Sequence, residues 1–388
     1  MKILKCFIIL FILIFITSCN SNIIDNDSDV LKKEKISPDI IMVSAGESHT
    51  AAIDINGGVW VWGYNNYGQI GDNTLKNKLS PVKMLDDATQ ISIGLWHTVA
   101  VKSDGFLWSW GWNLHGQLGE GYEDNKKPVK IVDNINNISA GLSFTMATDK
   151  NNILWAFGNN EFGQLGDDSK TEKYMPVKIM ENIIKISAGY NHTAAIDINN
   201  NLWVWGDNRY GQIGDGTVTV YDEIDGVIKN ELDDNDKLIP VKIMENIIRV
   251  SAGNGYTMAL DTDGLLWAWG DNYYGQLGDG TKIYSLTPVY IMKDVKQISA
   301  GNSHAAAITN DGSLWVWGDN QYGQLGDGTN SESLEPIKIM EDIVQVSAGS
   351  FYTMAIKSDG SLLAWGNNQY GQLGDGTKKN RLTPVKIN

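Results

Sequence analysis

The sequence predicts an all-β protein, a seven-bladed β-propeller whose blades are four-stranded antiparallel sheets. Three observations predict it: seven copies of one phrase, four strand-like segments in each copy, and no helical periodicity. The phrase reads WGDNRYGQIGDGT at residues 205–217, and its Gly-Gln-Leu/Ile-Gly core begins at Gly68, Gly116, Gly163, Gly211, Gly275, Gly323 and Gly371. A period of 47 or 48 residues, with one step of 64, is typical of propellers and solenoids, whose units cannot bury their apolar faces alone.

The fourth unit shows the four predicted strands in chain order. Residues 176–180 form a short strand with a proline at its first position, where a missing N–H is tolerated. Residues 183–187 and 192–198 are two further apolar runs, and residues 202–205 are the fourth. Several units separate the last two strands by Asp-Gly, which accepts positive φ and is the strongest short hairpin signal.

The two ends of the chain predict a closed ring. Six units contain a proline strand eleven residues before the serine of a Ser-Ala-Gly or Ser-Ile-Gly turn, but the first unit, entering at Ile40, lacks it. The chain ends instead with an unassigned strand of this kind at residues 384–387. We therefore expect the C-terminal strand to complete the N-terminal blade, because this pairing removes two exposed sheet edges. An open solenoid would need polar capping units, and none is apparent.

The propeller is predicted to span residues 40–388, with a targeting segment before it. Two lysines precede an apolar stretch at residues 7–16 that is too short to span a bilayer comfortably, and Ile-Thr-Ser-Cys follows. This pattern resembles the lipobox of bacterial lipoproteins. It implies a signal peptide at residues 1–18, a lipid on Cys19, and a propeller anchored extracytoplasmically in the bacterial cell envelope. An ordinary secretory signal or an uncleaved anchor is the alternative, and residues 19–39 would then follow as a flexible tether.

Composition and motifs narrow the function classes. A formal net charge of −15 argues against nucleic acid as a partner, since such proteins normally carry a basic patch. The sequence has no His-Glu-x-x-His helix, no Gly-x-Ser-x-Gly elbow and no cysteine after Cys19, so no enzyme and no cofactor are predicted. Ser48 and His49 are adjacent, as are Ser303 and His304, but adjacent strand residues point to opposite faces.

The repeated string S-A-G-x-x-H-T-A-A-I, L-W-V-W-G-x-N-x-Y-G-Q-L-G-D-G-T and P-V-K-I resembles the repeat of the regulator of chromosome condensation family over residues 40–388. The resemblance implies a seven-bladed propeller closed by strands from both termini. The eukaryotic founder is a nuclear exchange factor for the small GTPase Ran, and this activity depends on a wedge in one blade and a basic tail. The single insertion here, within residues 218–239, is acidic, so exchange on Ran is not expected. Another relative, a secreted bacterial propeller, inhibits β-lactamases with an aromatic-rich face.

Two repeated features have structural interpretations. The histidines at His49, His97, His192 and His304 are replaced by Phe144, Tyr256 and Tyr352 in the other blades, so packing or hydrogen bonding is predicted rather than a metal site. The Gly-Gln-Leu-Gly-Asp loop lacks a following Gly-Lys-Ser/Thr, so its aspartates are expected to cap tight turns rather than face a phosphate. The acidic insertion is interpreted as a solvated loop, with calcium binding or partner choice as alternatives.

Two sets of aromatic residues are candidates for binding. The first set stands just before each Gly-Gln pair and either packs the long loop or forms a binding ring: Tyr67, His115, Phe162, Tyr210, Tyr274, Tyr322 and Tyr370. The second set occupies loop positions where other blades carry polar or small residues: Trp96, Trp112, Tyr190, Tyr273 and Phe351. Because the fold does not demand the second set, and because exposed Trp and Tyr are typical interface hot spots, we expect it to bind a partner.

The sequence therefore predicts a non-catalytic, monomeric propeller that binds another protein and is attached to a membrane by an N-terminal lipid. One alternative is an inhibitor of an envelope or secreted enzyme. The other is a carbohydrate-binding propeller, in which the repeated aromatic ring rather than the second set would stack on sugars.

Overall fold

The computed structural model describes residues 39–224 and 227–387, which form seven four-stranded antiparallel sheets and one two-stranded hairpin. The seven-bladed, all-β prediction is confirmed. The predicted signal peptide, the lipidation of Cys19 and the tether fall on residues that lie outside this description, apart from Asp39. Within the described ranges, no helix has the length and apolar character needed to cross a bilayer.

Each blade contains an inner, a second, a third and an outer strand in chain order. The inner strands end in the Ser-Ala or Ser-Ile of the repeated turn: β1 (Ile40–Ala45), β5 (Ala88–Ile93), β9 (Ile135–Ala140), β13 (Ile183–Ala188), β19 (Ile247–Ala252), β23 (Val295–Ala300) and β27 (Ile343–Ala348). The second strands are almost wholly buried: β2 (His49–Asp54), β6 (His97–Lys102), β10 (Phe144–Asp149), β14 (His192–Asp197), β20 (Tyr256–Asp261), β24 (His304–Thr309) and β28 (Tyr352–Lys357).

The remaining two strands complete each sheet. The third strands end in glycine: β3 (Val59–Gly63), β7 (Leu107–Gly111), β11 (Leu154–Gly158), β15 (Leu202–Gly206), β21 (Leu266–Gly270), β25 (Leu314–Gly318) and β29 (Leu362–Gly366). The outer strands contain the prolines: β4 (Lys78–Leu85), β8 (Asn125–Val132), β12 (Lys173–Met180), β18 (Lys237–Met244), β22 (Ser285–Met292), β26 (Ser333–Met340) and β30 (Arg381–Lys386).

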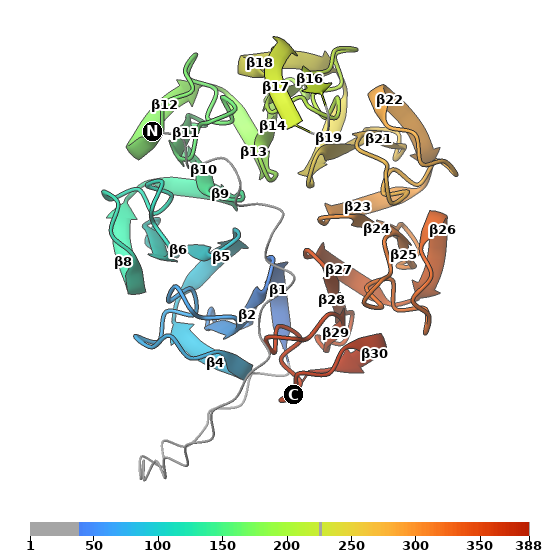
Figure 1. Cartoon of the computed structure of the whole chain (residues 1–388). Coiled ribbons are helices and arrows are strands. Elements are labelled where there is room, and N and C mark those ends of the chain that lie inside the picture. Colours follow the sequence, from blue (N-terminus) through green and yellow to red (C-terminus); the bar gives the residue numbers. More distant parts are fainter. Residues whose placement is uncertain (1–38, 225–226, 388) are drawn as a thin grey trace, which may run out of the picture. The chain divides into compact units, whose positions relative to one another are not determined.

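The blades follow one another around a closed ring, with the inner strands nearest the axis (Figure 1). The second strand of each blade packs against the inner strand of the next, from β2 on β5 around to β28 on β1. Because a second strand is covered on both faces by neighbouring blades, its sequence is a continuous apolar or small-residue run rather than an alternating one. The core is therefore a set of similar layers between blades.

The ring closes differently from the prediction. Strand β30 pairs with β29, where Val385 lies opposite Ala364, so the C-terminal strand completes the last blade and not the first. The sequence analysis places the proline strand at the start of each unit. In the structure, the proline strand instead follows the long Gly-Gln loop and pairs with the strand before that loop, as Val82 does with Val61. The short connection after each outer strand, for example at Asn182 with φ 65°, carries the chain into the next blade instead of turning it into a hairpin.

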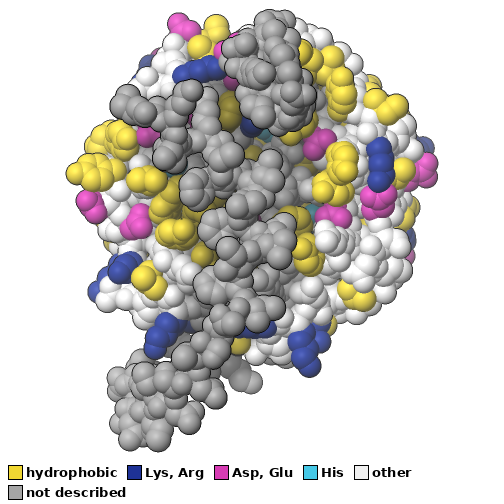
Figure 2. Space-filling model, viewed as in Figure 1, with side chains coloured by type: hydrophobic (Ala, Val, Ile, Leu, Met, Phe, Trp, Pro, Cys, Tyr) yellow, Lys and Arg dark blue, Asp and Glu magenta, His cyan; other side chains and the backbone are white. Residues whose placement is uncertain are grey.

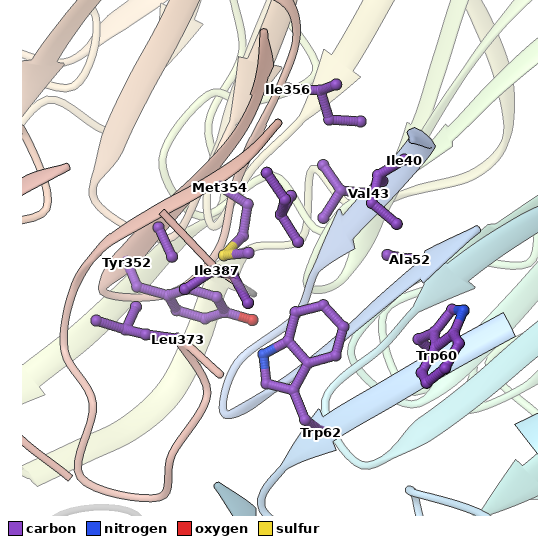
Figure 3. Packing of buried hydrophobic residues seen from close by; sticks show 12 residues of the cluster. Ile40, Val43, Ala52, Trp60, Trp62, Tyr352, Met354, Ile356, Leu373 and Ile387 are labelled. Atoms are coloured by element: carbon purple, nitrogen blue, oxygen red, sulfur yellow. The ribbon is translucent and has the colours of Figure 1, made fainter. Parts of the chain in front are cut away.

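The seam between the last and first blades has the same chemistry as the other junctions. The Ile40 N–H donates to the Gly360 carbonyl, just as the Ala88 N–H donates to Gly57 one blade later. Figure 3 shows the apolar layer at the seam, where Trp62 from the first blade lies beside Tyr352 from the last. Packing and backbone hydrogen bonds thus close the ring without exchange of strands between its ends.

Glycines allow the inner strands to approach each other around the axis. A Cβ on Gly349 would lie 2.6 Å from the Gly46 carbonyl oxygen, and a Cβ on Gly301 would lie 2.5 Å from that of Gly349. The Ser347 hydroxyl accepts a hydrogen bond from the Ala45 N–H, at 2.9 Å, and ties the same two blades together. The Ser-Ala-Gly motif is therefore an axial contact in which any larger residue than glycine would collide with backbone.

A repeated hydrogen-bond cluster, here called the latch, joins neighbouring blades. At the first junction the Gln69 carbonyl accepts from the Trp110 indole N–H and from the Thr98 hydroxyl, each at 2.9 Å. The His49 Nε2 lies 2.9 Å from the same hydroxyl oxygen, and since the Thr98 proton goes to Gln69, His49 is the donor. The Trp-to-Gln bond recurs at Trp62–Gln372, Trp205–Gln164, Trp269–Gln212, Trp317–Gln276 and Trp365–Gln324.

The acidic insertion folds into a hairpin of β16 (Val220–Ile224) and β17 (Val227–Asp233), where the sequence predicts a loop. This hairpin extends from the long loop that connects β15 to β18. At its base the Asp236 carboxylate accepts from the Asn208 N–H at 3.0 Å, a role that Asn77 has for Asn65 in the first blade. Lys170 bridges from the preceding blade to the Asp236 carboxylate at 3.2 Å, so the base of the insertion is anchored to two blades.

Candidate functional site

The Gly-Gln loops present one side chain from every blade on a common face. In the first blade the buried Asn65 organises the loop: its Oδ1 accepts from the Ile70 N–H and its Nδ2 donates to Asp72. The Asp72 carboxylate also accepts from the N–H and hydroxyl of Thr74, which confirms the predicted turn-capping role. The Gln69 Oε1 accepts from the Tyr67 N–H, which fixes the backbone at the aromatic position.

Six rings on this face form a continuous chain of contacts, here called the aromatic belt. It consists of Tyr370, Tyr64, Tyr67, Trp96, Trp112 and His115, from the seventh, first and second blades. Tyr67 stacks on Trp96 with ring centroids 4.7 Å apart, and Trp112 meets Trp96 edge-on at 5.0 Å. All six side chains are partly buried, so each ring presents an edge or face to solvent.

Two rings of the belt stand where other blades place a hydrogen-bond acceptor. After the third-strand glycine, Asp271 and Asp319 each accept from the side-chain Nε2 of the repeated glutamine, at 2.9 Å. Tyr64 and Trp112 occupy the same position in the first two blades. The Nε2 atoms of the corresponding glutamines, Gln69 and Gln117, are buried and have no hydrogen-bond partner. An unsatisfied buried donor costs about 1–3 kcal/mol. The blades with Asp271 and Asp319 at this position avoid that cost.

The structure brings only part of the second predicted set together. Trp96 and Trp112 are in contact within the belt, and Phe351 packs on Tyr322 beside it, with centroids 5.3 Å apart. Tyr190 lies elsewhere, at the axial opening, where its hydroxyl is 2.9 Å from the Ser350 hydroxyl of a distant blade.

Tyr273 belongs to a second aromatic surface on the fifth blade. It is 70% exposed, meets Tyr274 edge-on at 4.9 Å, and shares a pocket with Tyr210 at the foot of the insertion. Of the first set, Phe162 lies beneath the Arg209 guanidinium, 4.4 Å from its ring centroid. The repeated aromatic positions thus have different neighbours in different blades rather than one shared environment.

Two residues that the sequence analysis does not single out contribute to this surface. Tyr64 bridges the seam by contacting Tyr370 at 4.8 Å. Glu47 lines a pocket together with Tyr64, Trp96 and Tyr370, and it lines the axial opening as well. Burial raises the pKa of the Glu47 carboxyl to about 7. A sequence signal for both exists: each stands at a repeat position where no other blade has the same residue type.

The histidines of the second strands have the predicted structural role. Each Nε2 lies 2.9–3.0 Å from a threonine hydroxyl of the next blade: His49 with Thr98, His97 with Thr145, His192 with Thr257 and His304 with Thr353. Burial lowers their pKa values to about 3, 3, 4 and 3, so they are neutral at physiological pH. Among residues 39–224 and 227–387, no group of His, Cys, Asp or Glu is arranged to hold a metal ion.

Charge is unevenly distributed on the surface. On the face that Figure 2 shows, hydrophobic side chains are spread over the described surface from its rim inward, while Lys and Arg lie mainly toward the rim.

Comparison with known families decides the assignment. The model of the RCC1-like domain matches residues 19–243 and 182–388, which together include most of the chain. The chain belongs to the RCC1-like domain family. This RCC1-like propeller is also 38% identical over 64 residues to the probable E3 ubiquitin-protein ligase HERC4 of human and of rat. That match covers 16% of the chain and 6% of the length of those relatives.

Solved structures share the fold of this RCC1-like propeller. Human WBSCR16 superposes with a TM-score of 0.73 at 22% identity, covering 85% of this chain and 94% of that one. Prp20p of Saccharomyces cerevisiae, described with its binding properties to Gsp1p and histones, gives 0.70 at 23% identity, covering 83% and 84%. Yeast RCC1 (Prp20) in complex with Kap60 gives 0.72 at 18% identity, covering 95% and 91%. At these identities the likeness establishes the fold.

Proposed function

We propose that this RCC1-like propeller is a non-catalytic, monomeric docking protein that binds another protein through the aromatic belt. We further propose that a lipid on Cys19 anchors it to a bacterial membrane with the propeller on the extracytoplasmic side. A protein-binding role is in keeping with Prp20p, a propeller of the same fold that is described as binding Gsp1p and histones.

The observation that carries the proposal is the position of Tyr64 and Trp112. Each replaces an acceptor that the repeat supplies elsewhere, and each leaves a buried glutamine Nε2 without a partner. Natural proteins break local rules of this kind mainly at functional sites. The two rings also join the belt into one surface across three blades, and clustered Trp and Tyr side chains are the residues that dominate binding energy at interfaces.

Affinity capture with matched variants tests the proposal. Full-length protein is immobilised and exposed to envelope and secreted fractions of the source organism, in parallel with a Trp96→Ala/Trp112→Ala variant and a Tyr290→Ala variant. Tyr290 is 51% exposed on the outer strand β22, far in sequence from the belt, and serves as the control. We expect one protein to be retained in stoichiometric amount by the wild type and by Tyr290→Ala, and to be lost from the double variant.

The outcomes separate the alternatives. A captured enzyme whose activity falls on binding would identify the propeller as an inhibitor of an envelope or secreted enzyme. Retention of polysaccharide alone, sensitive to the repeated aromatic positions such as Tyr210 rather than to Trp96 and Trp112, would replace the proposal with carbohydrate binding. Equal retention by the double variant, with thermal unfolding unchanged, would contradict a role for the belt.

A further inference from the structure

A pocket lies on the belt at the seam between the last and first blades, and we call it the seam pocket. Five rings line it: Tyr64, Trp96, Tyr322, Phe351 and Tyr370. They come from the first, second, sixth and seventh blades, so the pocket exists only because the ring is closed. Its volume is about 260 Å³, enough to hold a side chain.

Glu47 lines this pocket, and it also lines the axial opening together with Tyr190. Glu47 stands after Ser-Ala-Gly in the loop between β1 and β2, where the other blades have Leu95, Leu142, Tyr190, Asn254, Asn302 and Ser350. Within the described part of the chain it forms no hydrogen bond and no ion pair. None of the described residues lining the pocket is basic. A partly buried carboxylate is normally paired, so the pocket lacks a counter-charge that a ligand could supply.

The ring arrangement favours one kind of counter-charge. Aromatic faces attract cations through their quadrupole, and cages of several rings are a known solution for binding substituted ammonium groups. A carboxylate beside such a cage adds a charge-assisted hydrogen bond for an ammonium that still carries N–H groups. Gln369 also lines the pocket, and its side-chain oxygen is a further acceptor, whereas the Asn367 Oδ1 already accepts from the Gln369 N–H and the Gln372 Nε2. The ammonium of lysine is a compact charge with three N–H donors on a flexible stem, so it can donate to the Glu47 carboxylate while it lies against the rings.

We propose that the seam pocket binds the ammonium group of a lysine side chain presented by the protein partner. This inference rests on the proposed docking role of the belt and names the chemistry that the partner must bring. The overall acidity of the propeller, with a formal net charge of −15, would favour approach of a lysine-bearing surface.

Titration of the pocket provides a signature that a merely structural Glu47 would not give. The titratable groups around it are Tyr64, Tyr190 and Tyr352, whose pKa values are all raised above 10 with burial as the largest cause. The buried His49 and His97 have pKa values near 3. Among the described residues around the pocket, Glu47 is therefore the group that changes charge between pH 5 and pH 8, and lysine binding should weaken as the pH falls through about 7.

The experiment uses Nα-acetyl-lysine methylamide as the probe, titrated into the full-length protein and followed by NMR. The neutral matched probe carries an acetyl group on Nε, and choline is a third probe without N–H groups. We expect a dissociation constant on the order of millimolar for the lysine probe at pH 8, and no binding of the acetylated probe. Binding should weaken about tenfold or more in Glu47→Gln and should lose its pH dependence there.

A second variant separates this inference from the proposed function. Trp112 lies on the belt but does not line the seam pocket. Trp112→Asn should therefore lose the captured partner while still binding the lysine probe. Failure of the wild type to bind the lysine probe, unchanged binding by a folded Glu47→Gln, or tighter binding of choline than of lysine would overturn the inference. Capture of a partner could persist in each of these cases, and the proposed function would then stand without the lysine.

Discussion

At the scale of single residues, two substitutions within the repeat distinguish function from folding. Tyr64 and Trp112 take a position that holds Asp or Asn in the other five blades, and they leave Gln69 and Gln117 with unpaired Nε2 atoms. A residue chosen for stability would keep the acceptor. The two aromatic side chains are therefore better explained by what they bind than by what they support.

Restoring the acceptor tests this explanation. Trp112→Ala removes the ring and leaves the Gln117 amide unpaired, whereas Trp112→Asn removes the ring and supplies the oxygen that Asn367 provides to Gln372 at 3.2 Å. We expect Trp112→Asn to be more stable than Trp112→Ala by about 1 kcal/mol, the value of one hydrogen bond. Urea unfolding of both variants measures the difference, and equal stability would mean that the unpaired amide has no cost.

At the scale of elements, the latch explains most of the repeated residues. The glutamine of each Gly-Gln loop uses its carbonyl to hold the next blade and its side chain to hold its own loop. The third blade departs from the pattern, because Phe157 stands where six blades have Trp. The carbonyl of Gln117 therefore accepts a hydrogen bond from the Thr145 hydroxyl, at 2.8 Å, but has no indole N–H to accept from.

Exchanging these residues tests the energetic role of the latch. Phe157→Trp should raise the free energy of unfolding by about 1 kcal/mol, because the site already holds Trp in equivalent blades and gains one hydrogen bond. The matched change Trp205→Phe should lower it by about 1–2 kcal/mol, because it removes the donor to Gln164. Thermal or urea unfolding measures the change in the free energy of unfolding for both variants. Destabilisation by Phe157→Trp would show that the third blade is packed differently and that the latch does not transfer between blades.

The elements also show which local structure the sequence can predict. Asp-Gly at residues 104–105 forms the hairpin between β6 and β7, with Gly105 at φ 84°, because few other residues accept this conformation. The pairing of the outer strands is not encoded so locally. The proline strand at residues 81–85 lies close in sequence to the next inner strand, yet it pairs back across a long loop, and only tertiary packing reveals this choice.

For the candidate site, too, the sequence predicts some features and not others. Periodicity places the repeated aromatic residues on one face, because equivalent positions in a ring have equivalent directions. It does not reveal which rings touch, since the contact of Tyr64 with Tyr370 depends on closing the ring. It also does not show that Tyr190 points to the axis and away from Trp96, because its loop position is one residue earlier than that of Trp96 in the repeat.

At the scale of the whole molecule, four buried histidines make the ring sensitive to acid. Burial lowers the pKa values of His49, His97, His192 and His304 from 6.5 to about 3 or 4, so the unfolded chain binds protons that the folded ring excludes. Stability is therefore expected to fall as the pH drops from about 6.5 toward 4, by up to about 2 kcal/mol per histidine at pH 5. Glu47, with its pKa raised to about 7, acts in the opposite direction, but it is one group against four.

Unfolding by urea at pH 7 and pH 5 measures this effect. His192→Phe provides the matched control, because the third blade already carries Phe144 at the equivalent position. The variant should lose less stability between the two pH values than the wild type does. An identical loss in both proteins would show that the histidines are not the groups that sense the acid.

If the aromatic belt is the docking surface, a bound partner must shield its rings from solvent. Hydroxyl-radical labelling of the full-length protein, with and without envelope and secreted extract, tests it within one sample, because Trp96 and Trp112 report on the belt and Tyr290 reports on the outer strands. We expect the extract to protect Trp96 and Trp112 while Tyr290 is labelled as before. Unchanged labelling of the belt, or protection of Tyr290 instead, would contradict a docking role for the belt.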